Sequence, residues 1–334
     1  MKVCIVGAGA IGGFIGTRLA RAGEAQVSAL ARGATLQALR TQGWRLRQGG
    51  ELLQAPATAS DDPAALGVQE LVVVALKGQA LPELAPRLAP LIGRDTLVLP
   101  AMNGVPWWFG RGVAALGDAP LQSVDPGGVV GRAIPFESVL GCVVHASTAT
   151  SEPGLVEHRM GQGLIVGEAS GGLSERVQRV VALLQNAGFD ATASANIRQD
   201  IWYKLWGNLT VNPVTAITGA TTDRVLDDPL VRAFCTAAMR EAAAIGERLG
   251  CAIAQSPDDR HAITRKLGAF RSSMLQDVQA GRAIELDAIV GVVHEIATRL
   301  GVASPNIDAL LGLTRLFGRV HGLYPDSPEA PATA

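Results

Sequence analysis

Three polar residues, Lys204, Asn208 and Asn212, recur at intervals of four within an otherwise apolar stretch. In a helix each step of four residues rotates by only about 40°, so the three side chains would line one narrow face. An ammonium group and two carboxamides on one face suit a cleft that holds a small polar anion. Pro213 lies in the same stretch and would bend the helix. A solvated lysine with two incidental asparagines is the alternative interpretation of this spacing.

A second candidate site lies at the start of the chain. The apolar run 2–6 predicts a buried parallel strand, and residues 13–22 have the pattern of a helix. The intervening residues form a GxGxxG motif, which lets backbone N–H groups approach a pyrophosphate at a helix N-terminus. A glycine-rich turn that binds nothing is the alternative. The residues expected to contact a nicotinamide cofactor here are Gly7, Ala8, Gly9, Ala10, Ile11 and Gly12.

Other polar residues follow the ends of predicted strands, where ligands bind in open α/β sheets. The second strand, 25–30, is followed by Arg32 and by no carboxylate, which favours NADPH because a guanidinium pairs with the 2′-phosphate. Lys77 follows the predicted strand 71–76, and Asn103 follows 96–100. We expect both to meet the cofactor or the substrate. Further along the chain, Ser273 and Glu285 could complete a site with Lys204.

The composition bounds the class of protein. The chain has 334 residues, of which 48% are hydrophobic and 18% charged, and its net charge is −1. This balance leaves no electrostatic signature of nucleic-acid or membrane binding. The four cysteines show no regular spacing, no metal centre is indicated, and no apolar run reaches the length of a membrane span. We expect a cytoplasmic protein with a small-molecule partner, and a homodimer is compatible with the sequence.

The order of predicted elements gives an α/β fold: an N-terminal Rossmann-type doubly wound sheet followed by an all-helical C-terminal domain. The predicted boundary gives domains 1–194 and 195–334, with residues 325–334 disordered. Residues 105–138 form an irregular excursion, and 154–159 pairs with 163–167 as a hairpin joined around Gly161. Helices are expected at 173–187, near 198–222, and near 224–250, 257–280, 283–301 and 305–319.

With these residues in place, the chain resembles the ketopantoate reductases (2-dehydropantoate 2-reductases) over nearly its whole length. The resemblance rests on VGAGAIGG, ALARG, LKGQ, MNG, PGLVEH, KLWGNLTVNPVTA and SSMLQD followed by IELD. It implies a Rossmann domain followed by a helical domain. It also implies reduction of 2-dehydropantoate, a branched 2-oxo acid, with NADPH, an early reaction of pantothenate and coenzyme A biosynthesis.

The resemblance also implies roles for individual residues. Lys204 would be the general acid that protonates the new alkoxide, and Glu285 would contact both that lysine and the cofactor. Asn208, Asn212 and Ser273 would contact the substrate. The remaining cofactor contacts would come from Gly7–Gly12, Arg32, Lys77, Asn103 and Ala146. The chemistry is coherent, because a lysine at the carbonyl oxygen stabilises the charge that builds there and then donates its proton.

Two departures concern substrate choice and leave alternatives open. The excursion is longer and richer in Trp, Gly and Pro than in compact members of the family. Thr222 stands where some members carry an asparagine for the distal hydroxyl of the substrate. A reductase of another 2-oxo acid is therefore one alternative. A β-hydroxyacid dehydrogenase, which also uses a Lys-x-x-x-Asn pair, is a second, and a non-catalytic NADP-binding sensor is a third.

Overall fold

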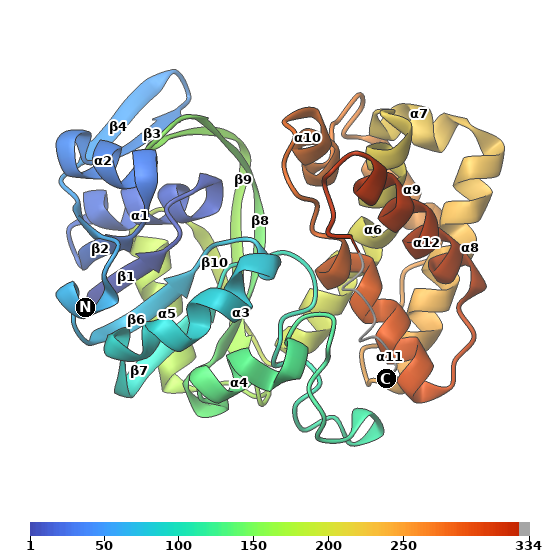
Figure 1. Ribbon diagram of the computed structural model, residues 1–334, viewed down its shortest axis with the longest axis horizontal. Coiled ribbons are helices and arrows are strands. Elements are labelled where there is room, and N and C mark those ends of the chain that lie inside the picture. Colours follow the sequence, from blue (N-terminus) through green and yellow to red (C-terminus); the bar gives the residue numbers. More distant parts are fainter. Residues whose placement is uncertain (327–334) are drawn as a thin grey trace, which may run out of the picture. The chain divides into compact units, whose positions relative to one another are not determined.

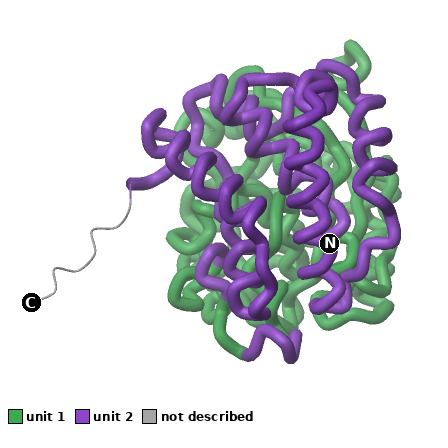
Figure 2. Tube along the Cα trace, turned by 90° about the vertical axis from the view of Figure 1, so that its right-hand side faces the viewer, with its two compact units in different colours: residues 1–112, 118–120, 125–201 green, residues 113–117, 121–124, 202–334 purple. Residues whose placement is uncertain are grey.

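The computed structural model describes residues 1–326, which form two compact units (Figure 1). The first unit contains residues 1–112, 118–120 and 125–201, and the second contains 113–117, 121–124 and the chain from Trp202 onward; Figure 2 colours them separately. Most of the tail for which we expected disorder, from residue 327 on, lies outside the described residues.

The first unit contains both strands and helices. Its strands are β1 (Lys2–Val6), β2 (Gln26–Leu30), β3 (Trp44–Gln48), β4 (Glu51–Ala55), β5 (Thr58–Ser60), β6 (Gln69–Val74), β7 (Ile92–Pro100), β8 (Leu140–Glu152), β9 (Leu155–Glu168) and β10 (Asp190–Ser194). Its helices are α1 (Ala10–Ala22), α2 (Gly33–Gln42), α3 (Leu81–Leu84), α4 (Val129–Ala133) and α5 (Glu175–Asn186).

The first sheet is parallel throughout and has the order β5-β2-β1-β6-β7. Strands β2 and β5 are added on one side of β1, and β6 and β7 are added later on its other side. The strand order therefore reverses between β1 and β6, which is where such sheets bind nucleotides. The predicted Rossmann-type sheet is confirmed. Strand β5 forms the edge of this sheet and pairs with β2.

A second, mixed sheet has the order β10-β9-β3-β4, and β8 pairs antiparallel with β9. The predicted hairpin around Gly161 is wrong, because β9 is one strand of 14 residues. The reversal comes earlier, at Gly154, whose φ is +73°. Gly161 also has a positive φ, of +72°, and a Cβ there would lie 2.5 Å from the carbonyl oxygen of His145. It therefore forms an irregularity within the β8–β9 ladder, where glycine is required.

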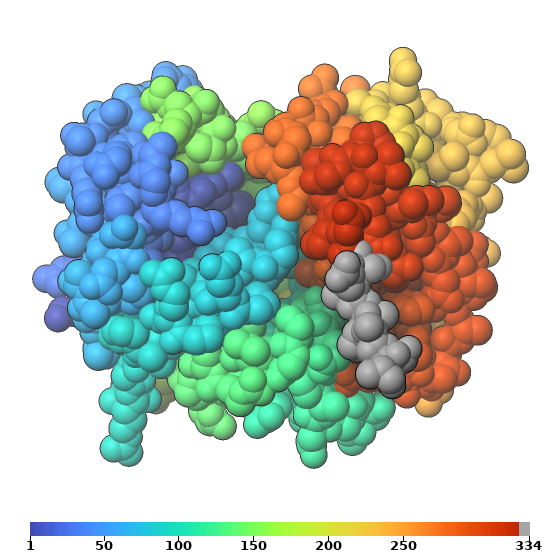
Figure 3. Space-filling model, in the orientation of Figure 1, coloured from blue at the N-terminus to red at the C-terminus, as the bar shows by residue number. Residues whose placement is uncertain are grey.

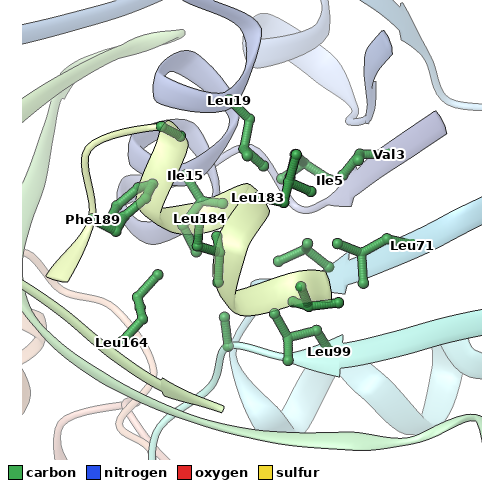
Figure 4. Packing of buried hydrophobic residues seen from close by; sticks show 14 of the residues in the cluster. Val3, Ile5, Ile15, Leu19, Leu71, Leu99, Leu164, Leu183, Leu184 and Phe189 are labelled. Carbon is green, nitrogen blue, oxygen red and sulfur yellow. The ribbon is translucent and has the colours of Figure 1, made fainter. Parts of the chain in front are cut away.

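Both sheets share one apolar core with α1 and α5. Figure 4 shows side chains of the first sheet, α1, α5 and β9 pointing toward one another, and nearly all of them are fully buried. Glycines let α1 approach the second sheet closely. A Cβ at Gly13 would lie 2.5 Å from Val156 in β9, and a Cβ at Gly16 would lie 2.5 Å from the Trp44 ring in β3. Helix α1 is thus held tightly between the strand that precedes it and the second sheet.

From Ile197 on, the described chain is helical, as predicted. Its helices are α6 (Ile197–Thr218), α7 (Thr222–Asp227), α8 (Pro229–Arg248), α9 (Pro257–Arg265), α10 (Ser273–Gln279), α11 (Val292–Leu300) and α12 (Pro305–Val320), with a π-helical turn at Asp287–Gly291. Two of the expected helices are each divided into two. Asp228, for example, accepts hydrogen bonds from the N–H groups of Leu230 and Val231 and so starts α8 afresh. Helix α12, red in Figure 3, lies at the surface of the second unit.

Glu295 of α11 fastens part of the excursion to the second unit. Its carboxylate accepts hydrogen bonds from the N–H groups of Gln122 and Ser123, both at 2.8 Å, and pairs with Arg299 at 2.6 Å. Burial alone would raise the pKa of Glu295, but the hydrogen bonds from Ser123 and Gln122 and the charge of Arg299 outweigh it and lower that pKa. The excursion therefore contains short helical turns and a specific anchor, and residues 121–124 belong to the helical unit.

None of the helices within residues 1–326 is both long and apolar enough to cross a membrane. The four cysteines are buried and unpaired with one another, and burial raises the pKa of Cys4 and Cys235 to about 11. The thiols of Cys4 and Cys235 therefore have little thiolate character at neutral pH.

Candidate active site

The glycine turn after β1 lies against the end of β6, at the point where the strand order reverses. The Gly7 N–H donates to the Leu30 carbonyl at 3.0 Å, and the φ of Gly7 is +90°. A Cβ at Gly7 would lie 2.9 Å from the carbonyl oxygen of Ala75, and one at Gly12 would lie only 2.0 Å from the Gly7 carbonyl. The first and last glycines of the motif thus close a turn that has no room for side chains.

Gly9 has the opposite property. It stands at the N-cap of α1 without a side-chain cap, and no atom lies within 4 Å of the position that its Cβ would occupy. The first turn of α1 also carries no acidic residue. Open space beside uncapped N–H groups at the positive end of a 13-residue helix fits the diphosphate of a dinucleotide. The donor set therefore suits the cofactor predicted from the motif.

The other predicted cofactor residues lie mostly at the carboxyl ends of the parallel strands. Arg32 is exposed at the N-cap of α2, just after β2, and has no ionic partner among the described residues. Lys77 is half-buried after β6, and Asn103 is half-buried after β7. The Ala101 N–H donates to the Val74 carbonyl at 2.8 Å and ties the last two of these strand ends together. Ala146 lies elsewhere, in β8, where the ladder with β9 is irregular.

In the second unit, α6 carries the polar stripe on the face away from its anchors to α8. The indole of Trp202 donates to the Ala242 carbonyl at 3.1 Å, and that of Trp206 donates to the Met239 carbonyl at 2.7 Å. Both tryptophans are fully buried. Each lies two positions from Lys204, about 200° around the helix, so Lys204 projects on the opposite face. The helix and the common face of Lys204, Asn208 and Asn212 agree with the sequence analysis.

Burial of the three polar side chains increases along α6. Lys204 and Asn208 are half-buried, whereas Asn212 is 5% exposed and its Nδ2 has no hydrogen-bond partner among the described residues. Buried amide N–H groups are normally paired, because leaving one unpaired costs about 1–3 kcal/mol. The unpaired Nδ2 on the Lys204 face is therefore available to donate a hydrogen bond to a polar acceptor.

Ser273 is exposed at the first position of α10, while its neighbour Ser272 is buried. The Ser272 hydroxyl lies 2.6 Å from that of Thr215 in α6 and accepts the Leu275 N–H as the N-cap of α10. Ser272 therefore places the start of α10, and with it Ser273, beside α6. The sequence analysis missed the role of Ser272 as the N-cap of α10. Ser272 and Ser273 are adjacent, and from the sequence either serine could be the cap.

Thr222 has a structural task. It is 1% exposed, its hydroxyl donates to the Gly268 carbonyl at 2.8 Å, and its N–H donates to the Phe270 carbonyl at 3.0 Å. Thr222 thus holds the connection between α9 and α10. An asparagine at the same position would have to make these contacts in its place.

Glu285 lies in the irregular connection after α10, two residues before the π-helical turn, and is half-buried. Its immediate neighbours Ile284 and Leu286 are buried at 3% and 0% exposure. These buried neighbours hold the backbone on both sides of the glutamate.

Comparison with known proteins identifies the family. One family model, described as ketopantoate reductase PanE/ApbA, matches residues 3–171, and its C-terminal counterpart matches 196–317. A 2-dehydropantoate 2-reductase from Mesorhizobium japonicum is 41% identical over 325 residues, covering 97% of this chain and 100% of the relative. The chain belongs to the ketopantoate reductase family. As a member of it, the protein is an oxidoreductase of a type that uses a nicotinamide cofactor.

Solved structures agree with membership in the ketopantoate reductase family. A chain from Ralstonia solanacearum MolK2, described as a ketopantoate reductase, superposes with a TM-score of 0.93 at 54% identity, covering 97% of this chain and 99% of that one. A PanE/ApbA family ketopantoate reductase from Ralstonia eutropha JMP134 gives a TM-score of 0.80 at 27% identity, covering 96% and 100%. A D-mandelate dehydrogenase in complex with NADH and anilino(oxo)acetate shares the fold at 19% identity, with a TM-score of 0.81 and coverage of 97% and 100%.

Proposed function

We propose that the protein reduces 2-dehydropantoate to pantoate with NADPH, as part of pantothenate and coenzyme A biosynthesis. The observation that carries the proposal is the Lys204, Asn208 and Asn212 stripe of α6, in a chain 41% identical to a 2-dehydropantoate 2-reductase. The reaction adds a hydride to the C2 carbonyl carbon and a proton to its oxygen. When bound, the reduced nicotinamide supplies that hydride.

In this proposal the chain supplies the proton, the anchoring of the cofactor and the orientation of the substrate. Lys204 holds its ammonium at the carbonyl oxygen, stabilises the negative charge that develops there and donates the proton. The Asn212 amide, which is buried and lacks an acceptor, donates a hydrogen bond to the substrate. Asn208, Ser273 and Asn103 provide further polar contacts.

Glu285 has two tasks in this scheme. Its carboxylate attracts the Lys204 ammonium and so fixes its position, and it accepts a hydrogen bond from the cofactor's ribose. The glycine turn, Gly7–Gly12, takes the diphosphate on the N-terminus of α1. Arg32 pairs with the 2′-phosphate, and Lys77, Asn103 and Ala146 complete the cofactor contacts.

A panel of 2-oxo acids tests the reaction directly. Purified protein is assayed with 2-dehydropantoate, 2-oxoisovalerate, pyruvate and anilino(oxo)acetate, each with NADPH and with NADH. We expect the highest kcat/KM for 2-dehydropantoate with NADPH. A higher value for another 2-oxo acid would reassign the substrate. Oxidation of 3-hydroxy acids with NADP⁺ but no reduction of 2-oxo acids would indicate a β-hydroxyacid dehydrogenase, and NADPH binding without turnover would indicate a sensor.

The Arg32→Ala variant tests the choice of cofactor. We expect its KM for NADPH to rise and the NADPH/NADH preference to fall on the order of tenfold or more, because a charge-assisted hydrogen bond contributes about 1.5–3 kcal/mol. Arg94→Ala is the control, since Arg94 is an exposed arginine near the amino end of β7. An unchanged NADPH/NADH preference in Arg32→Ala would show that another residue reads the phosphate.

A further inference from the structure

The chain returns to the Glu285 segment after α12 ends. Gly322 (φ +66°) turns the backbone, and the N–H groups of Leu323 and Tyr324 both donate to the Gly318 carbonyl, at 2.7 and 3.1 Å. A Cβ at Gly318 would lie 2.7 Å from the Cβ of Tyr324, so glycine is needed for this close return. We call Leu323 and Tyr324 the C-terminal clasp. The matched C-terminal family region ends at residue 317, before the clasp begins.

The clasp holds the chain on both sides of Glu285. On one side, the Ile284 N–H donates to the Leu323 carbonyl at 3.0 Å. On the other side, the Tyr324 hydroxyl donates to Oδ1 of Asp287 at 2.6 Å. These two anchor points are one residue before and two residues after Glu285, which itself precedes the helical residues. The position of the glutamate therefore depends on contacts made by the last described residues of the chain.

The second anchor joins two side chains, Asp287 and Tyr324, whose pKa values are both raised. Burial raises the pKa of Asp287, and the Tyr324 hydrogen bond and the charge of Arg315 in α12 only partly oppose it. Burial also raises the pKa of Tyr324, as do the hydrogen bond and the charge of Asp287, against the attraction of Arg315 and Arg319. The phenol therefore remains a donor at neutral pH. It is the only hydrogen-bond donor to this carboxylate among residues 1–326.

Removing that donor would disturb the start of the helix. A partly buried carboxylate that loses its donor would take up a proton more readily or move toward water. Asp287 opens the π-helical turn, and its Oδ1 lies on the side of Gly291, one turn further along the helix. Movement of Asp287 would be transmitted along the backbone to Glu285, two residues earlier.

We infer that Tyr324 is a positioning residue for Glu285. It touches neither substrate nor cofactor in this scheme, and it acts by fixing the segment that carries the glutamate. The inference rests on the proposed function, which places Glu285 beside Lys204 and the cofactor.

The test is a double-mutant cycle with Tyr324→Phe and Glu285→Gln, measuring kcat/KM for 2-dehydropantoate and the Kd of NADPH. Tyr324→Phe removes one hydroxyl and keeps the ring. We expect kcat/KM to fall about tenfold or more, because small displacements of a catalytic group can cost up to about 100-fold. The double variant should be no worse than Glu285→Gln alone, since Tyr324 acts through that residue.

Ser304→Ala is the matched control. It also removes one hydroxyl bonded to a carboxylate, that of Asp308 at 3.0 Å, but at the opposite end of α12. Its kinetics should match those of the unmodified protein. Should Tyr324→Phe fail to fold, Asp287→Asn keeps an acceptor oxygen and weakens the same hydrogen bond. It should give a smaller loss in the same direction, again absent in the Glu285→Gln background.

The outcomes separate the two proposals. Full activity of Tyr324→Phe beside an impaired Glu285→Gln would overturn the positioning role alone. Losses that multiply in the double variant would also overturn it, because a merely structural contact adds to any other defect. Full activity of Glu285→Gln would remove that residue from the proposed mechanism, and the role of Tyr324 would fall with it.

Discussion

Replacing Lys204 with alanine is expected to lower kcat by about 100- to 10,000-fold, the range typical of losing a positioned proton donor. NADPH binding should remain nearly unchanged, because the glycine turn and Arg32 belong to the nucleotide-binding unit. The fold should persist as well, since α6 is anchored through Trp202 and Trp206 on its opposite face. Steady-state kinetics and NADPH titration measure the two effects separately.

Two further variants define what Lys204 does. Lys204→Arg keeps the positive charge but should remain nearly as inactive as alanine, because a guanidinium does not release its proton near neutral pH. Lys266→Ala, at the exposed C-cap of α9, controls for loss of a lysine in the same unit and should be fully active. Parallel losses of turnover and NADPH affinity in Lys204→Ala would contradict the proton-donor role. Substantial activity in Lys204→Arg would show that charge alone suffices.

The second large effect concerns the glycine turn. In Gly12→Ala the new Cβ would lie 2.0 Å from the Gly7 carbonyl and 3.0 Å from Ile5, so backbone must move. Overpacking of this kind costs about 1–3 kcal/mol and occasionally more. We expect Tm to fall by roughly 5 °C, together with a loss of NADPH affinity, as measured by thermal unfolding and fluorescence titration.

Gly9→Ala is the counterpart within the same motif. Its Cβ would meet no atom of the chain within 4 Å, so Tm in the absence of NADPH should hardly change. The added methyl group occupies the space that we assign to the diphosphate, and NADPH affinity should still fall. If Gly9→Ala bound NADPH normally, the diphosphate would not lie on this side of the turn. If Gly12→Ala were as stable as Gly9→Ala, the turn would be more pliable than its contacts indicate.

Local patterns in the sequence predicted the parts of the fold that depend on local physics. The buried strands β1 and β6, the glycine turn and the stripe of α6 each have a short-range signature of apolar runs, glycine spacing or helical period. Gly161 shows the limit of that reasoning. A glycine with positive φ serves a turn or a strand irregularity equally well, and only pairing with β8 decides between them.

Long-range contacts were beyond sequence reasoning. The sequence around Glu295 does not show that its carboxylate accepts hydrogen bonds from the N–H groups of Gln122 and Ser123, more than 170 positions earlier. The same holds for the Ser272–Thr215 contact that places α10. Tyr324 meets Asp287 across 37 positions. The Ser272 and Tyr324 contacts each hold a segment that carries a proposed site residue, whereas the residues proposed to do chemistry were identifiable from type, spacing and family resemblance.

The attachment of residues 121–124 to α11 determines how the protein could be divided into fragments. Because Gln122 and Ser123 belong to the helical unit, a single cut after Ile201 does not separate the units at a natural border. A fragment starting at Trp202 would carry Glu295 without its two amide donors. The N-terminal fragment would in turn keep a strip of polypeptide whose packing surface is gone. Evolution could therefore exchange these halves between proteins only by carrying the strip and its glutamate along together.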